Sequence, residues 1–144
     1  SGNGANNTIK DNATNSTQSV INGGITADNI KKDSPNDAAT NEIHLKNLSL
    51  HGDITAFNAG QNQITFLQAQ MQGNINADTK GKNLITMDKD SKVNINGNVT
   101  ATDGGENTLT LKEKADLQIA SDNNDKSFQA IGEGSKNTLS EDNG

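Results

Sequence analysis

The chain lacks cysteine, arginine, tryptophan and tyrosine, and it contains one proline and three phenylalanines. Without cysteine it forms no disulfide, no thiolate zinc site and no cysteine nucleophile. Without arginine it has no bidentate clamp for a phosphate or carboxylate. No apolar run approaches the roughly 20 residues of a membrane helix, so we expect no transmembrane segment. The first residues carry no basic stretch followed by an apolar run, so we also expect no signal peptide.

Apolar residues are scarce as well, at 29% of 144 residues, which fit one domain. The net charge of -6, with lysine as the only basic residue besides two histidines, argues against nucleic acid as a partner. Such polarity favours disorder, but disordered chains usually carry more charge than the 21% and more proline than is present here. The pattern of residues along the chain therefore decides between a folded and a disordered chain. Asparagine is the most frequent residue, at 23 positions.

The chain is a tandem repeat. One block, exemplified by NEIHL at 41–45, NQITF at 62–66 and NLITM at 83–87, begins with an asparagine. Its asparagines are Asn7, Asn41, Asn62, Asn83, Asn107 and Asn137. A second block, such as HGDITA at 51–56, contains a glycine, and these glycines are Gly23, Gly52, Gly73 and Gly97. The repeats lie near 7–29, 41–61, 62–82, 83–106 and 107–136, with a partial copy at 137–140.

Apolar and polar residues alternate within each repeat, which is the period of a half-buried strand. Each central repeat contains three such short pairs, for example Ile43 with Leu45, Leu48 with Leu50, and Ile54 with Ala56, which predict three short strands in each coil. We therefore predict an all-β chain: a parallel β-solenoid of about five coils of 21 to 24 residues with insertions at the turns. The predicted core residues are Ile43, Leu45, Ile54, Ile64, Phe66, Ile75, Ile85, Val99, Leu109 and Leu111.

The two recurring polar positions have structural interpretations. Stacked amides of Asn41, Asn62, Asn83, Asn107 and Asn137, with Asn7 below them, predict an asparagine ladder at one turn. The glycine positions predict a corner that needs positive φ or a close backbone approach. Departures from the period predict loops at turns; these are 28–40, 88–92, 103–106 and 122–126.

These repeats resemble the passenger domains of bacterial autotransporters, in the vacuolating-cytotoxin-like and adhesin-like group. The resemblance rests on asparagine-led strands such as NQITF, followed by Gly-Asn-Ile-x-Ala at 73–77, over about residues 5–140. It implies a right-handed parallel β-helix, virulence-associated secretion through the outer membrane, and display at the bacterial cell surface or release. Since no translocator barrel and no capping helix are found in the sequence, we expect a segment cut from a longer passenger, with open end coils prone to end-to-end self-association.

Candidate reactive groups are few. His44 and His51 fall in the outward phase and are interpreted as solvated histidines rather than metal ligands. Asp122–Asp125 and Asp88–Asp90 resemble fragments of calcium loops, without the glycine and distal glutamate of a calcium hand. Asp53 has Gly24, Asn74 and Asn98 at the equivalent positions of neighbouring repeats, so no glycosidase-type carboxylate pair is predicted.

The sequence therefore predicts no catalytic residue, no cofactor and no metal. Threonine columns such as Thr65, Thr86 and Thr110 are interpreted as ordinary strand residues rather than an ice-binding face. We expect a non-catalytic stalk or adhesion module that contacts a host-surface or protein receptor and the neighbouring coils of a longer passenger. The alternatives are a segment of a vacuolating toxin, and a β-helical polysaccharide-processing enzyme, which would need a cleft of convergent carboxylates.

Overall fold

The computed structural model describes residues 6–10, 19–28, 39–120 and 128–142. Within these ranges every regular element is a strand. The strands are β1 (Asn6–Lys10), β2 (Ser19–Asn22), β3 (Ile25–Asp28), β4 (Thr40–His51), β5 (Ile54–Phe57), β6 (Gln61–Gln72), β7 (Ile75–Ala77), β8 (Lys82–Asn96), β9 (Val99–Thr102), β10 (Glu106–Lys112), β11 (Asp116–Ala120), β12 (Phe128–Ile131) and β13 (Lys136–Asp142). In the same ranges no helix is long and apolar enough to cross a membrane.

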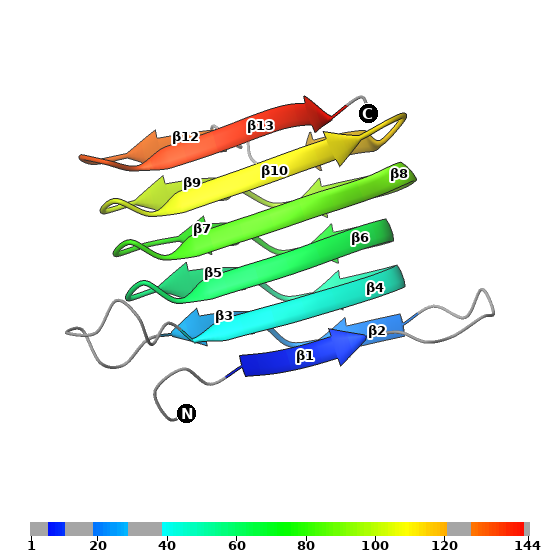
Figure 1. Cartoon of the computed structure of the whole chain (residues 1–144), viewed down its shortest axis with the longest axis horizontal. Helices are drawn as coiled ribbons and strands as arrows, with labels where there is room; N and C mark the ends of the chain where they lie inside the picture. The colour runs from blue at the N-terminus through cyan, green and yellow to red at the C-terminus, as the bar shows by residue number, and fades with distance from the viewer. Residues whose placement is uncertain (1–5, 11–18, 29–38, 121–127, 143–144) are drawn as a thin grey trace.

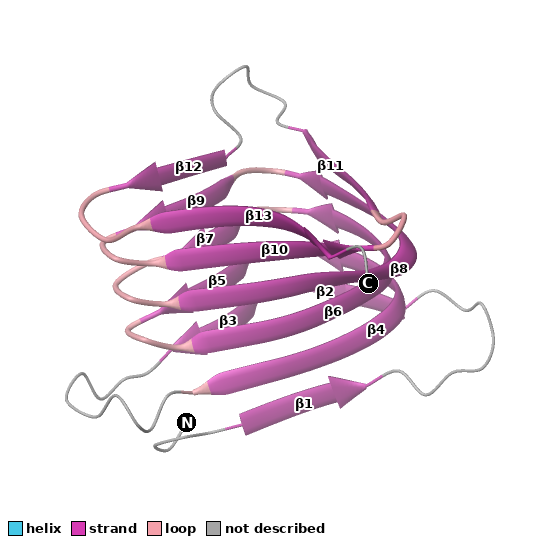
Figure 2. Cartoon of the chain, turned by 45° about the horizontal axis from the view of Figure 1, so that its top comes forward, coloured by secondary structure: helices cyan, strands magenta, loops and turns pink. Residues whose placement is uncertain are grey.

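The strands form two parallel sheets. In the eight-stranded sheet the order is β1-β4-β6-β8-β10-β13, while β2 pairs with β4 and β11 pairs with β8. The five-stranded sheet has the order β12-β9-β7-β5-β3. Figure 1 shows the strands stacked from β1 at one end to β13 at the other, and Figure 2 shows the two sheets facing each other. The prediction of an all-β chain is confirmed, and every pairing between repeats is parallel.

Equivalent residues of successive repeats lie opposite each other throughout. Ile43 pairs with Ile64, and Ile64 pairs with Ile85. In the second sheet Ile54 lies opposite Ile75 and Ala56 opposite Ala77. Side chains of a strand alternate between its two faces, so this register places the inward aliphatic side chains of successive repeats on top of each other. The resulting aliphatic columns fill the space between the sheets.

The core between the sheets is a cluster of buried apolar side chains. Predicted core residues that are buried are Ile43, Ile54, Ile64, Phe66, Ile75, Ile85, Val99 and Leu109. Leu111 is partly buried against this cluster, and the side chain of Leu45 lies outside the described part of the chain. Alanine columns such as Ala56 and Ala77 line the short second sheet, where little room is left for larger side chains. Each buried isoleucine contributes on the order of 1.5–3 kcal/mol, which offsets the low apolar content.

Each central repeat contains two strands, so the prediction of three short strands is wrong there. The first two apolar pairs of a repeat lie on one long strand, as in β6, which contains both Phe66 and Ala69. A single residue, Leu67, separates the two halves of β6, and the register with β8 shifts between Phe66 and Gln68. One intervening residue bends the strand without ending it (Figure 2). In the fifth repeat the halves are separate, as β10 and β11.

The predicted loop at 88–92 is a bulge inside β8 and not a connecting loop. Met87 lies opposite Phe66 and Lys92 lies opposite Gln68, so 88–91 replaces the single residue Leu67. Asp90 reaches positive φ, 58°, to accommodate the extra residues. The predicted loop at 103–106 is a turn that ends where β10 begins at Glu106. Most of the predicted loops 28–40 and 122–126 lies outside the described residues.

Candidate functional site

The asparagines of the repeat form a continuous side-chain ladder. The Nδ2 of each asparagine donates to the Oδ1 of the asparagine in the next repeat, over distances of 2.8–3.0 Å. The order is Asn7, Asn41, Asn62, Asn83, Asn107 and Asn137. The central members are fully buried, since Asn62, Asn83 and Asn107 have exposed fractions of 0%. Their polar atoms therefore depend on protein partners.

From Asn41 onward, the amide nitrogen of each ladder residue also ties the two sheets together. Nδ2 of Asn62 donates to the carbonyl of Thr55 at 2.8 Å, and Nδ2 of Asn83 donates to the carbonyl of Asn76 at 2.7 Å. Asn107 makes the same bond to Thr100 at 2.8 Å. Each buried amide thus bonds along the stack and across the turn, which is a structural role because the amides are closed off from any ligand.

The glycines of the second block lie at a tight corner. Gly23, Gly52 and Gly73 have φ of 139°, 154° and 151°. A Cβ on Gly52 would lie 2.6 Å from the carbonyl carbon of Gly23, and one on Gly73 would lie 2.6 Å from that of Gly52. A Cβ on Gly97 would likewise overlap the backbone of Gly73. Gly52 and Gly73 therefore need both positive φ and the close backbone approach, whereas Gly23 shows the positive φ alone and Gly97 the close approach alone.

Asp53 takes part in a second polar stack beside that corner. Its Oδ1 accepts from the backbone N–H of Asn74 at 2.7 Å and from Asn74 Nδ2 at 3.3 Å. Oδ1 of Asn74 in turn accepts from the backbone N–H of Asn98 at 2.9 Å. The Asp53 carboxylate thus holds the next repeat in place instead of facing a second acid.

A further glycine column was missed at the sequence level. Gly60, Gly81 and Gly105 are buried, and a Cβ on each would overlap the carbonyl group of Ala27, Ala56 or Ala77, respectively. Each follows a two-residue turn with positive φ, and its N–H closes the turn by bonding the carbonyl three residues earlier. The signal was available in the sequence, because a glycine stands two residues before the ladder asparagine in three repeats.

The two histidines lie apart on the outer face of β4. His44 Nε2 lies 2.8 Å from Glu42 Oε1, and His51 Nε2 lies 3.0 Å from Ser49 Oγ. The bond to His44, with a smaller effect from the charge of Lys10, lowers the pKa of Glu42. Each ring thus bonds to a polar neighbour two residues away on its own strand, and the two rings do not converge.

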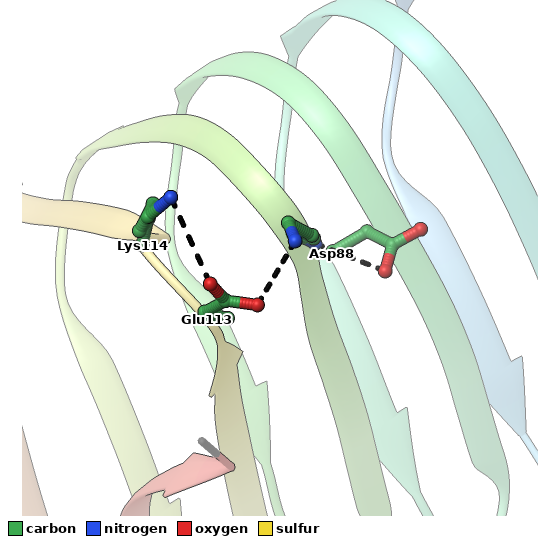
Figure 3. Close-up of polar contacts among 4 residues, drawn as sticks. Asp88, Glu113 and Lys114 are labelled. Carbon is green, nitrogen blue, oxygen red and sulfur yellow. Dashed lines mark hydrogen bonds and ion pairs between the residues drawn. The ribbon is translucent and has the colours of Figure 1, made fainter. Parts of the chain in front are cut away.

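Asp88 in the β8 bulge forms an ion pair with a neighbouring repeat. Asp88 Oδ1 lies 3.1 Å from Lys112 Nζ and accepts from the backbone N–H of Lys89 at 3.0 Å. These bonds, that of Lys112 first, lower the pKa of Asp88. Glu113 bridges Lys89 at 2.9 Å and Lys114 at 3.7 Å (Figure 3). The cluster is balanced in charge; the other calcium-like stretch, 122–125, lies outside the described residues.

A hollow lies on the outer face of the eight-stranded sheet, beside the bends of β4, β6 and β8. It is a groove of about 270 Å³. Its lining residues are Asn47, Leu48, Gln68, Ala69, Gln70, Lys92 and Asn94. Leu48 and Ala69 are buried, while Gln68, Gln70 and Asn94 are exposed. We call this the amide groove.

The amide groove offers hydrogen bonds and no reactive group. An amide side chain presents two donors and an acceptor, which match the hydroxyls of a sugar or the backbone of an extended peptide. Lys92 adds one positive charge. The alternation of the sequence places Gln68 and Gln70 on one outer face but does not predict the groove. Their convergence with Asn47 and Asn94 depends on the register between strands.

No group of three or more histidine or acidic side chains that could hold a metal occurs within the described ranges. Comparison of the chain with protein-family models, curated proteins and solved structures finds no match. The features of the described residues that bear on function are the regular stack of repeats and the amide groove on its outer face.

Proposed function

We propose that the chain is a non-catalytic β-solenoid module of a bacterial autotransporter passenger, acting as a stalk that also binds a polar ligand. In this proposal the repeats form the coils of a right-handed parallel β-helix. The module stands at the bacterial surface or is released, and its amide groove contacts a hydroxyl-rich ligand such as a saccharide of a host or neighbouring cell.

The observation that carries the stalk role is the in-register pairing of the repeats on both sides of the strand bend. Aliphatic core residues and asparagines recur at equivalent positions from β4 to β10, and the asparagine ladder runs through all of these strands. Inter-repeat bonds distributed along the whole stack make a rod that is stabilised by its nearest neighbours. Such a rod can be lengthened by adding repeats without changing its cross-section.

The binding role rests on the amide groove. Exposed amide side chains of Gln68, Gln70 and Asn94 surround a floor made by Leu48 and Ala69. Lectin sites that lack stacking aromatics must rely on such polar side chains, and this chain has only three aromatic residues. Weak binding that gains strength from many copies on one surface fits an adhesive stalk.

The test is binding of the purified chain to an array of neutral and acidic oligosaccharides. A variant with Gln68→Ala and Gln70→Ala should lose at least tenfold in signal on every saccharide that the parent chain binds. The matched control is Gln63→Ala, an exposed glutamine on the same strand, in the half of β6 that does not line the groove. The control should bind like the parent.

Four results would contradict the proposal. Equal loss in the Gln68/Gln70 variant and in the Gln63 control, or no binding to any saccharide, would remove the amide groove as a ligand site. Cleavage of a bound polysaccharide would favour an enzyme. Release of dye from lipid vesicles would favour a segment of a vacuolating toxin over an adhesive stalk.

A further inference from the structure

Within the described part of the chain, the two ends of the stack are strands with one unpaired edge and with apolar residues in the inward phase. Within the described residues, no strand pairs with the outer edge of β1 or of β13. Ile9 on β1 and Leu139 on β13 belong to the column of Ile43, Ile64 and Ile85. Their exposed fractions are 46% and 55%, whereas the inner members of the column are buried.

The asparagine ladder has a direction, which makes its ends different. Every Nδ2 donates toward the C-terminal end, from Asn7 to Asn41 and onward to Asn137. Within the described residues, no donor reaches Oδ1 of Asn7, so the N-terminal end presents an acceptor. At the C-terminal end Nδ2 of Asn137 donates to the backbone carbonyls of Val99 and Gln129, so a stacked copy would exchange one of these bonds for the ladder bond. A second copy stacked in the same orientation therefore continues the ladder, whereas a copy stacked in the opposite orientation places like groups together.

The edge strands also match in sequence. β10, β13 and β1 contain Asn107-Thr108-Leu109, Asn137-Thr138-Leu139 and Asn7-Thr8-Ile9. The pairing of β10 with β13 already places the first of these on the second, residue for residue. We propose that β13 of one copy pairs in parallel with β1 of a second copy, head to tail, with Asn137 opposite Asn7 and Leu139 opposite Ile9.

This junction is one strand pair wide. The column β1-β4-β6-β8-β10-β13 contains one strand more than the five-stranded sheet, so β13 projects beyond β12 by about one strand spacing, roughly 4.8 Å. β12 and β3 of stacked copies therefore stay too far apart to pair. A narrow contact of this kind gives association that depends on protein concentration, and because the contact does not close on itself it gives chains of copies.

Sedimentation velocity over a range of concentrations is the first test. The parent chain should show species larger than the monomer at high concentration, and more of them at 0.5 M than at 0.05 M salt because salt screens the net charge of -6. Ile9→Lys and Leu139→Lys should each abolish these species. Leu84→Lys is the matched control, since Leu84 is 42% exposed and lies on a central strand away from both ends.

Mixing the two blocked variants tests the head-to-tail arrangement directly. The Ile9→Lys copy keeps an intact β13 and the Leu139→Lys copy keeps an intact β1, so an equimolar mixture should form dimers and nothing longer. Restored dimers also show that both variants are folded. Association that survives in Leu139→Lys alone would mean that N-terminal ends pair with each other, and it would overturn the proposal.

A cross-link provides a second measurement that needs no destabilising change. The chain has no cysteine, and Thr8 and Thr138 are exposed at opposite ends of the stack (Figure 1). The double variant Thr8→Cys with Thr138→Cys should yield a ladder of covalent oligomers on oxidation, because in-register residues on neighbouring strands lie within disulfide reach. The Thr8→Cys variant alone should form no ladder of covalent oligomers on oxidation. A parent chain that remains a monomer at high concentration and high salt, with no cross-linked ladder, would overturn the proposal.

Discussion

The buried asparagines provide the most specific pairing information at the scale of single residues. An aliphatic column tolerates sliding, because isoleucine packs on valine or leucine with little difference in free energy. An amide ladder does not, because a shifted asparagine leaves a buried donor and acceptor without partners. Asn62 and Asn83 are 0% exposed, so water cannot replace those partners. The ladder thus selects one register among those that the aliphatic columns allow.

Replacing Asn83 with leucine tests this role. The change leaves Nδ2 of Asn62 without its acceptor and removes the donors that reach Oδ1 of Asn107 and the carbonyl of Asn76. At about 1–3 kcal/mol for each stranded buried group, the free energy of unfolding should fall by several kcal/mol. Urea denaturation followed by circular dichroism measures the loss.

The control for that variant is the same substitution on the same strand. Asn96 is exposed at the end of β8, so Asn96→Leu should change the free energy of unfolding by less than about 0.5 kcal/mol. Similar losses in the Asn83 and Asn96 variants would show that the ladder does not hold the register.

A titration checks the ion pair at the bulge. Lys112 beside Asp88 lowers the pKa of Asp88, so the pair stabilises the fold above the ordinary carboxyl pKa of about 3.9, and the contribution is lost as pH falls through the lowered value. In Lys112→Met, the Asp88 pKa measured by NMR should rise toward its ordinary value. The stability change should be small because both side chains are more than 40% exposed. An unchanged pKa would show that the backbone bond from Lys89 alone holds it.

At the scale of elements, the turn before each ladder asparagine controls how closely the two sheets join. Thr79 and Lys80 both adopt positive φ, and Gly81 N–H bonds the carbonyl of Asp78 at 2.8 Å. Two successive residues of positive φ form a type I′ turn. The following glycine lies directly against the backbone of β5. A Cβ at that position would overlap the carbonyl oxygen of Ala56.

Gly81→Ala should therefore separate the turn from β5. Its Cβ would overlap the carbonyl of Ala56, a backbone group that cannot move without breaking the sheet. We expect a loss of about 1–3 kcal/mol or more in the free energy of unfolding. Thr79→Ala, at the exposed tip of the same turn, is the control and should cost less than about 1 kcal/mol. Equal stability of Gly81→Ala and the parent would mean that this turn stands away from the sheet.

The alternation within each repeat and the recurring asparagine were sufficient to predict strands, parallel pairing and most of the core, because both depend on neighbours at a fixed spacing. The continuity of β6 was not predicted, since the break in alternation at Leu67 is compatible with a bend or with a loop. The bulge at 88–91 has the polar composition of a loop, and its place inside β8 follows only from the pairing of the flanking Met87 and Lys92 with β6. The amide groove needs side chains from three repeats, which no single repeat contains.

At the scale of the whole molecule, the stack has no central element on which everything else depends. Each repeat contacts the one before and the one after, so its stability is the sum of its own folding and its two interfaces. The end repeats have one interface, and their inward residues show the difference: Ile9 and Leu139 are about half exposed, whereas Ile64 and Ile85 are buried. The stack should therefore open from its ends.

Amide hydrogen exchange measures that gradient. At a protein concentration low enough to keep the chain monomeric, the ladder-side amides of β6 and β8 should exchange most slowly, because both edges of these strands are paired. Amides of β1 and β13 should exchange fastest, since opening them breaks one interface only. Protection should decrease stepwise from the centre toward each end, and Asn83→Leu should reduce it most in the repeats on either side of β8. Uniform protection across the described strands would instead mean that the whole stack unfolds in one step, with coupling between repeats too strong for any end to open alone.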